Sequence, residues 1–185
     1  MNEDIIEEIC EMEWEMFQNV SNIGGRAPCQ DDKNSFEIMR SSQAKSWSEG
    51  VLASYHLDLL EAKKAGRNLM MEKYARMMES TSPAEFKKFK NALPPLSPEA
   101  YAVVEEIIRN YIEWEEEVAA KYPNIVKQGR PLRSTEDTQN ATSLETYLRG
   151  ELSTYSLRTL ALYLDNILKQ KEKGINGAEV TRRLE

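Results

Sequence analysis

Hydrophobic residues recur every three or four positions along most of this chain, which is the spacing of an α-helix that buries one face. In the first such stretch, Ile5, Ile9 and Met16 share a face and predict a helix over 3–20. The same spacing predicts further helical segments that begin near residues 34, 49, 68, 82, 97 and 142. No stretch of the chain is typical of a strand-rich region. The pattern therefore predicts an all-α fold, a bundle of five to six helices with a long C-terminal helix.

Polar residues and glycines mark where the predicted helices begin and end. Capping boxes are predicted over 34–37, 82–85 and 142–145. Gly66 and Gly174 follow predicted helix ends, where glycine is a favoured C-terminal cap. The last predicted helix, 142–173, is the longest. Residues 124–141 are polar and aperiodic, which predicts a long surface loop whose role the sequence leaves open.

The length and composition are those of a folded protein. A chain of 185 residues fits one domain, and we predict a single helical domain over 1–176 with a frayed tail over 177–185. Hydrophobic residues make up 41% and charged residues 30%, which excludes a disordered chain. The net charge of −7 disfavours nucleic-acid binding, since that function needs a basic face.

The ends and the cysteines predict a cytoplasmic location. The acidic N-terminus lacks the pattern of a signal peptide, and no apolar run approaches the roughly 20 residues that cross a bilayer. No membrane partner is expected. Cys10 and Cys29 are too few for a disulfide scaffold and are expected to be reduced thiols.

Several segments, in order along nearly the whole chain, carry a family resemblance: Glu13-Trp14 with Phe17, Cys29-Gln30, and residues 36–40, 66–81 and 142–152. Together they resemble an uncharacterised bacterial, all-helical family that is catalogued as a domain of unknown function (family 4125). The resemblance implies a bacterial, cytoplasmic, helical protein. It implies no activity, substrate or cofactor, so the cofactors stay unknown and no residue role follows from it.

Three charged residues fall on apolar helix faces: Glu13, Arg40 and Glu151. Buried charges are costly unless they are paired and hydrogen-bonded, so we expect these three to meet in the interior. Such a cluster either fixes the helix register or forms a polar pocket, and the sequence leaves both interpretations open. On the segment 68–79, by contrast, the apolar face predicts that Glu72, Lys73 and Arg76 point mostly to solvent.

A polar pocket would predict a binding protein or an enzyme for a small anionic metabolite. Its ligand-binding candidates are Arg40, Arg67, Tyr147 and Tyr155. The catalytic residues are unknown, but Glu13 or Glu151 would be the acid or base, with a pKa raised by burial. Arg67 follows Gly66 at a helix junction, where it either binds an anion or pairs with a carboxylate.

Other function classes receive weaker support. No metal is predicted: His56, the single histidine, has Ala53 where a two-metal helical site needs a glutamate, although an all-carboxylate magnesium site stays open. Cys29 would need a nearby base to act as a nucleophile, and the sequence cannot place one beside it. The alternative to a small-molecule site is a helical interaction module, with self-association, or a regulatory module without catalytic activity.

Overall fold

The structure, a computed structural model, describes residues 2–22, 25–126 and 129–185. Within these ranges the chain forms ten α-helices and three short 3-10 helices and has no β-strand, which confirms the all-α prediction. The α-helices are α1 (Asn2–Gln18), α2 (Lys33–Lys45), α3 (Glu49–Lys64), α4 (Leu69–Thr81), α5 (Pro83–Phe89), α6 (Pro98–Lys121), α7 (Pro123–Val126), α8 (Leu144–Leu152), α9 (Leu157–Glu172) and α10 (Gly177–Leu184).

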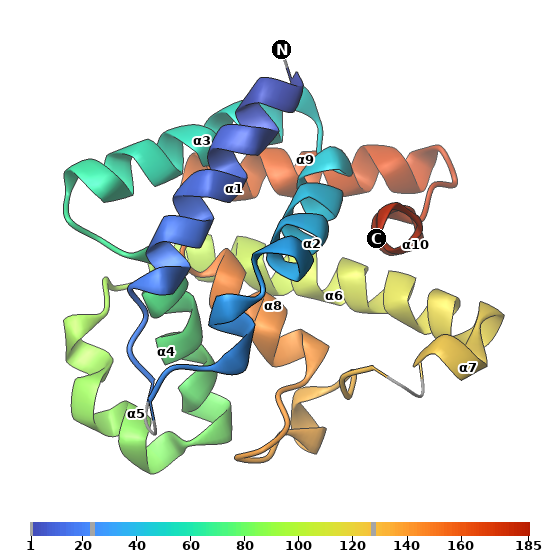
Figure 1. Cartoon of the computed structure of the whole chain (residues 1–185). Helices are drawn as coiled ribbons and strands as arrows, with labels where there is room; N and C mark the ends of the chain where they lie inside the picture. The colour runs from blue at the N-terminus through green and yellow to red at the C-terminus, as the bar shows by residue number, and fades with distance from the viewer. Residues whose placement is uncertain (1, 23–24, 127–128) are drawn as a thin grey trace.

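The helices pack in two groups, and α6 joins them because it packs on α9 of one group and on α8 of the other. In the upper part of Figure 1, α1 crosses α3, and α3 packs on α9, which in turn lies on α6. In the lower part, α4 packs along α8 and carries α5. α2 lies at the front of this view against α1, and α10 is seen end-on beside α2, with α6 beneath it. The middle of the molecule is therefore enclosed by α1, α2, α4, α8 and α10.

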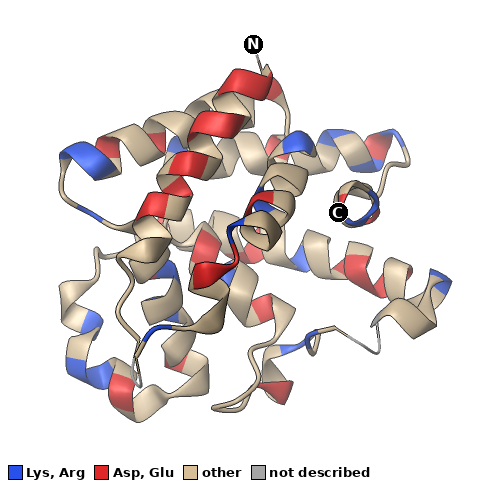
Figure 2. Ribbon diagram, in the orientation of Figure 1, with Lys and Arg blue, Asp and Glu red and all other residues tan. Residues whose placement is uncertain are grey.

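Helix α1 shows how one helix face is buried. Acidic residues follow the helix along its length (Figure 2), and most of them, such as Glu7 and Glu11, are exposed. The opposite face carries Ile6, Ile9 and Phe17, which are buried in the core. Glu13 is the exception, since it lies on the buried face. The amphipathic pattern thus fixes the direction in which this one carboxylate points.

The predicted capping boxes are not the caps that the structure uses. Helix α2 is capped by the Asp32 carboxylate, which accepts a hydrogen bond from the Ser35 backbone N–H, so the helix starts before residue 34. Helix α8 is capped by Ser143 rather than by Thr142. The Ser82 side chain makes no capping hydrogen bond at the start of α5. In α2 and α8 a neighbouring side-chain oxygen therefore takes the place of the predicted cap, whereas Ser82 keeps the N-cap position of α5 without a side-chain hydrogen bond.

The long C-terminal helix is wrong as predicted, because the chain breaks between α8 and α9. The Ser153 and Thr154 hydroxyls donate to carbonyls of their own helix, which competes with further helix hydrogen bonds. The Asp58 carboxylate of α3 accepts from the Ser156 N–H at 3.0 Å, and the Ser156 hydroxyl caps α9. The longest helix is instead α6, with 24 residues, and the described residues contain more helices than the five to six predicted.

The segment expected to be a frayed tail forms helix α10, packed on α6. Gly174 has φ 69°, a left-handed conformation that lets the chain turn back after α9. Gly177 then lies against Trp114, where an added Cβ would come within 2.6 Å of the indole ring. Ion pairs join Glu179 to Lys121 and Arg182 to Glu115. The contact between Gly177 and Trp114 could not be predicted from the sequence, because the segment is too short to show a helical periodicity.

The predicted loop over 124–141 is described except for residues 127–128. It starts with α7 and contains a short 3-10 helix, Ser134–Glu136, and an isolated bridge between Thr138 and Ala141. The Asp137 carboxylate accepts from the Ser143 N–H at 2.6 Å, which ties the loop to the start of α8. Among the described residues, no helix is both long and apolar enough to cross a membrane.

Candidate functional site

Three charged side chains from distant parts of the chain meet in the interior, as expected. The Arg40 guanidinium donates from Nε to Glu13 Oε1 at 3.0 Å and from Nη2 to Glu13 Oε2 at 2.5 Å. Its Nη1 donates to Glu151 Oε1 at 2.6 Å. All three residues are buried. One arginine thus bridges two carboxylates, with a forked pair on one side, the geometry in which guanidinium binds carboxylate most strongly.

A fourth charge, Lys73, joins them, and the prediction that it faces solvent is wrong. Lys73 is only 1% exposed. Its Nζ donates hydrogen bonds to Glu151 Oε1 at 3.0 Å and to the Tyr147 hydroxyl at 2.5 Å. Nζ also lies 3.8 Å from the centre of the Tyr147 ring. The face of α4 that carries Lys73 is covered by α8. Periodicity within α4 could not reveal this, because it depends on a partner helix.

Tyrosines and an amide complete the hydrogen bonds of both carboxylates. Tyr55 donates to Glu13 Oε2 at 2.6 Å, and Tyr155 donates to Glu151 Oε2 at 2.8 Å. Gln43 donates to Glu151 Oε2 at 3.0 Å. Each Glu151 oxygen therefore accepts two hydrogen bonds. We call the four charged residues Glu13, Arg40, Lys73 and Glu151 the charge network; its two negative and two positive charges balance.

The charge network keeps Glu151, Arg40 and Lys73 ionised. Burial alone would raise the pKa of Glu151, but the charges and hydrogen bonds of Arg40 and Lys73 outweigh burial and hold this pKa well below the ordinary value. Burial would lower the pKa of Arg40 and Lys73, yet the adjacent carboxylates raise both. The raised pKa expected for Glu151 as a catalytic acid is therefore wrong. Glu151 stays a charged hydrogen-bond acceptor.

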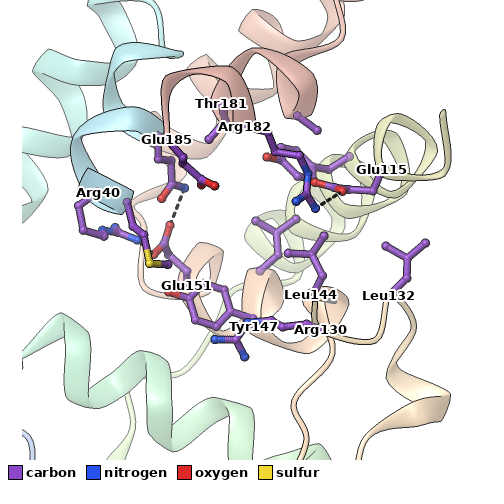
Figure 3. Close-up of a pocket in the computed structure, with 16 residues that line it drawn as sticks. Arg40, Glu115, Arg130, Leu132, Leu144, Tyr147, Glu151, Thr181, Arg182 and Glu185 are labelled. Atoms are coloured by element: carbon purple, nitrogen blue, oxygen red, sulfur yellow. Dashed lines mark hydrogen bonds and ion pairs between the residues drawn. The ribbon is translucent and has the colours of Figure 1, made fainter. Parts of the chain in front are cut away.

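An interhelical pocket of about 260 Å³ opens beside the charge network. Figure 3 shows its side chains converging from α2, α6, α8, α10 and the segment after α7. Four residues bonded within or to the network form part of its wall: Arg40, Gln43, Tyr147 and Glu151. Apolar and aromatic side chains form another part of the wall, namely Met39, Tyr111, Leu132, Leu144, Leu148 and Ala178. The pocket thus has a polar floor and an apolar part of its wall.

Further charged residues stand at the other sides of the pocket. Arg182 of α10 donates to Glu115 of α6 at 2.8 Å, and the Glu115 side chain is buried. The Arg130 guanidinium lies 4.6 Å from the centre of the Tyr147 ring. Glu185 lines the pocket beyond α10, and burial raises the pKa of its carboxyl. Periodicity could not reveal these residues, because they reach the pocket only through the packing of α10 and of the segment after α7.

The structure brings together most of the residues singled out in the sequence, with one exception. Tyr147 lines the pocket, and Tyr155 lies behind it on Glu151. Arg67 does not line this pocket. It forms a forked ion pair with Glu72 at 3.0 and 2.8 Å, which was the non-binding alternative for this residue. Cys29 is exposed and is also outside the pocket lining.

Comparison with known proteins identifies the family of this chain. A family model described as "Protein of unknown function (DUF4125)" matches residues 3–184, which confirms the family that the sequence resembles. The bacterial origin that the resemblance implies stays a prediction. No curated protein and no solved structure matches the chain. The geometry of the site is therefore the basis for any statement about function.

Proposed function

The chain belongs to the DUF4125 family, whose function is unknown, and we propose from its geometry that it binds a small molecule in the interhelical pocket. The observation that carries this proposal is that two members of the charge network, Arg40 and Glu151, line the pocket and form part of its floor. Small-molecule sites are concave, mostly apolar and contain a few well-placed polar groups. This pocket has that composition.

The network gives the pocket a rigid floor. Arg40 is held by two carboxylates, and Glu151 is held by four donors from α2, α4 and the turn between α8 and α9. A side chain with so many partners cannot rotate without breaking several hydrogen bonds. Side chains that are already held in place lose less conformational entropy when a ligand binds. Specific binding sites are commonly preorganised in this way. The polar floor therefore supports recognition of a defined ligand.

Binding is better supported than acid–base catalysis. An efficient catalytic acid or base has a pKa near the working pH. The pKa of Glu151 is held far below that range, and both of its oxygens are already bonded. Glu13 is bonded to Arg40 and Tyr55 and does not line the pocket. The proposal is accordingly a binding protein, with the charge network as a fixed electrostatic surface.

We also propose a cytoplasmic location. Cys10 and Cys29 are both free, and Cys29 is exposed. An exposed free thiol persists in a reducing compartment and is readily oxidised outside one. The ligand of the pocket would then be a metabolite of the cytoplasm.

A thermal-shift screen against a metabolite library tests the proposed function, since a ligand that binds only the folded protein raises the melting temperature. The variant Leu144→Trp places a large side chain in the pocket wall. The matched control is Leu57→Trp, at an exposed position of α3. We expect hits on the wild type that are lost in L144W and kept in L57W. Hits that survive in L144W, or an absence of hits across a broad library, would contradict the proposal.

A further inference from the structure

Building on the proposed function, we infer that the ligand is a small monocarboxylic acid with an apolar body and that its carboxylate binds Arg130. This assigns the recognition of the anion to Arg130 and not to Arg40. Three features of the pocket support this assignment: the ion pairs of its other arginines, the apolar part of its wall, and the position of Glu185.

Among the three arginines that line the pocket, Arg130 is the one without an ion-pair partner in the described part of the chain. Arg40 is bound by Glu13 and Glu151, and Arg182 is bound by Glu115. Arg130 forms no ion pair with any carboxylate of the part of the chain that the structure describes. Within the described residues, Arg130 Nη1 donates a hydrogen bond to the Thr142 carbonyl, which is long at 3.4 Å. A carboxylate ligand would supply the missing charge partner.

The Tyr147 ring orients this guanidinium at the pocket wall. The Arg130 carbon Cζ lies 4.6 Å from the ring centre, while Lys73 Nζ lies 3.8 Å from the same centre and donates to the ring hydroxyl. The ring is therefore fixed by the charge network. Guanidinium groups stack on aromatic rings and bind carboxylates through two parallel N–H bonds. Figure 3 shows Arg130 next to Tyr147 at the edge of the cavity.

The wall beside Arg130 is suited to an apolar body. Leu132 and Leu144 lie on the same side of the cavity as Arg130 in Figure 3, and Leu148 and Met39 extend this surface. Burial of apolar ligand surface here would provide the main favourable free energy. The volume of about 260 Å³ lies below the range of roughly 300–1,000 Å³ for drug-sized ligands. The ligand is therefore a small acid.

A pocket carboxylate disfavours a second negative charge on the ligand. Glu185 lies on the α10 side of the pocket, across from Arg130, and forms no ion pair within the described residues. Glu151 adds little to this effect, because Arg40 and Lys73 already pair with it. A second negative group on the ligand that approached Glu185 would be repelled, because like charges in a partly buried site repel. A dicarboxylate is thus disfavoured relative to a monocarboxylate of the same shape.

Titration calorimetry with three matched probes tests the inference. The probes are 3-phenylpropanoate, its neutral amide, and benzylmalonate, which adds a second carboxylate to the same skeleton. The proteins are the wild type, Arg130→Gln, and Arg133→Gln, whose arginine is exposed, pairs with Glu116 and is outside the pocket lining. We expect the wild type to bind 3-phenylpropanoate about tenfold or more tightly than either other probe, a difference of about 1.4 kcal/mol.

The variants separate this inference from the proposed function. R130Q should lose the preference for the acid over the amide, and R133Q should keep it. If acid and amide bind equally and both are excluded by L144W, the pocket binds ligands but the acid class is wrong. If the preference survives in R130Q, or if the acid does not bind the wild type, the inference is overturned. If the thermal-shift screen gives no hits, or if all of its hits survive in L144W, the proposed function is overturned instead.

Discussion

Arg40 joins two carboxylates that lie 27 and 111 residues away in the sequence, so this one side chain connects α1, α2 and α8. Its burial is tolerated because the guanidinium pairs with two carboxylates and the polar atoms of the network have hydrogen-bond partners. Replacement of a complete buried ion network by apolar residues can leave the stability unchanged. Removal of one partner instead leaves the other buried charges unpaired and lowers the stability. The consequence of a single substitution in the network is therefore large.

The substitution Arg40→Met should lower the free energy of unfolding by about 3–5 kcal/mol, because it leaves two buried carboxylates without their arginine. Arg133→Met, which removes an exposed arginine, should change it by about 0.5 kcal/mol or less. Urea unfolding followed by circular dichroism at neutral pH measures both. A stability for R40M equal to that of the wild type would mean that Arg40 serves only a ligand.

Acid should destabilise the protein through Glu151. Its pKa in the folded state is depressed below the ordinary value of 4.5, so the folded protein takes up this proton less readily than the unfolded chain. The resulting stability is present above pH 4.5 and is lost as the pH falls toward the folded pKa. Urea unfolding of the wild type and of Glu151→Gln between pH 7 and pH 3 should show their stability difference narrowing with acid. Parallel curves would contradict this assignment.

The sequence predicted part of this network and missed the rest for a physical reason. Helical periodicity gives the direction of a side chain on its own helix, which was sufficient for Glu13, Arg40 and Glu151. It does not show whether a second helix covers a polar face. Lys73 was therefore assigned to solvent, although α8 buries it. Arg130, in a loop, has no periodicity that could place it at the pocket.

At the scale of elements, the contact between α4 and α8 places Lys73 against the floor of the pocket. Gly150 makes the contact close: a Cβ there would lie 2.8 Å from both the Lys73 carbonyl oxygen and Met77 Cγ. The missing side chain lets the two helices approach closely enough for Lys73 to reach Glu151. The resemblance segment 142–152 contains this glycine, but the sequence alone did not reveal its role.

The substitution Gly150→Ala should therefore destabilise the protein by about 1–3 kcal/mol, because the helices must separate to admit the new methyl group. Alanine would otherwise favour the helix by about 1 kcal/mol over glycine. Gly50→Ala in α3 is the matched control, since its Cβ would meet Leu162 at an ordinary 3.7 Å. Chemical unfolding should show G50A as neutral or more stable. A gain of stability in G150A would contradict the close contact.

At the scale of the whole molecule, the pocket exists because α10 packs over the space between α2, α6 and α8. The all-α class followed from the periodicity, but the break between α8 and α9 and the docking of α10 did not. Both depend on tertiary contacts, namely Asp58 with Ser156 in the first case and Gly177 with Trp114 in the second. The predicted helices thus contained most of the fold and lacked the element that closes the pocket.

The substitution Gly177→Ala should loosen α10, because its Cβ would overlap the Trp114 ring at 2.6 Å. Trypsin cleavage after Arg182 or Arg183, followed by mass spectrometry, reports the detached helix, since cleavage of a transiently open segment follows its population. We expect cleavage about tenfold faster than in the wild type, equivalent to about 1.4 kcal/mol. G50A should match the wild type. Equal cleavage of G177A would show that α10 does not depend on this contact.

A crystallographic fragment screen tests the central claim most directly, because it shows where small molecules bind and which atoms they contact. The account predicts that fragments concentrate in the interhelical pocket, with polar atoms near Arg130 or the floor formed by Arg40, Tyr147 and Glu151. It predicts unchanged positions for the charge network in those complexes. Fragments bound elsewhere on the protein, with only water in this pocket throughout the screen, would contradict it.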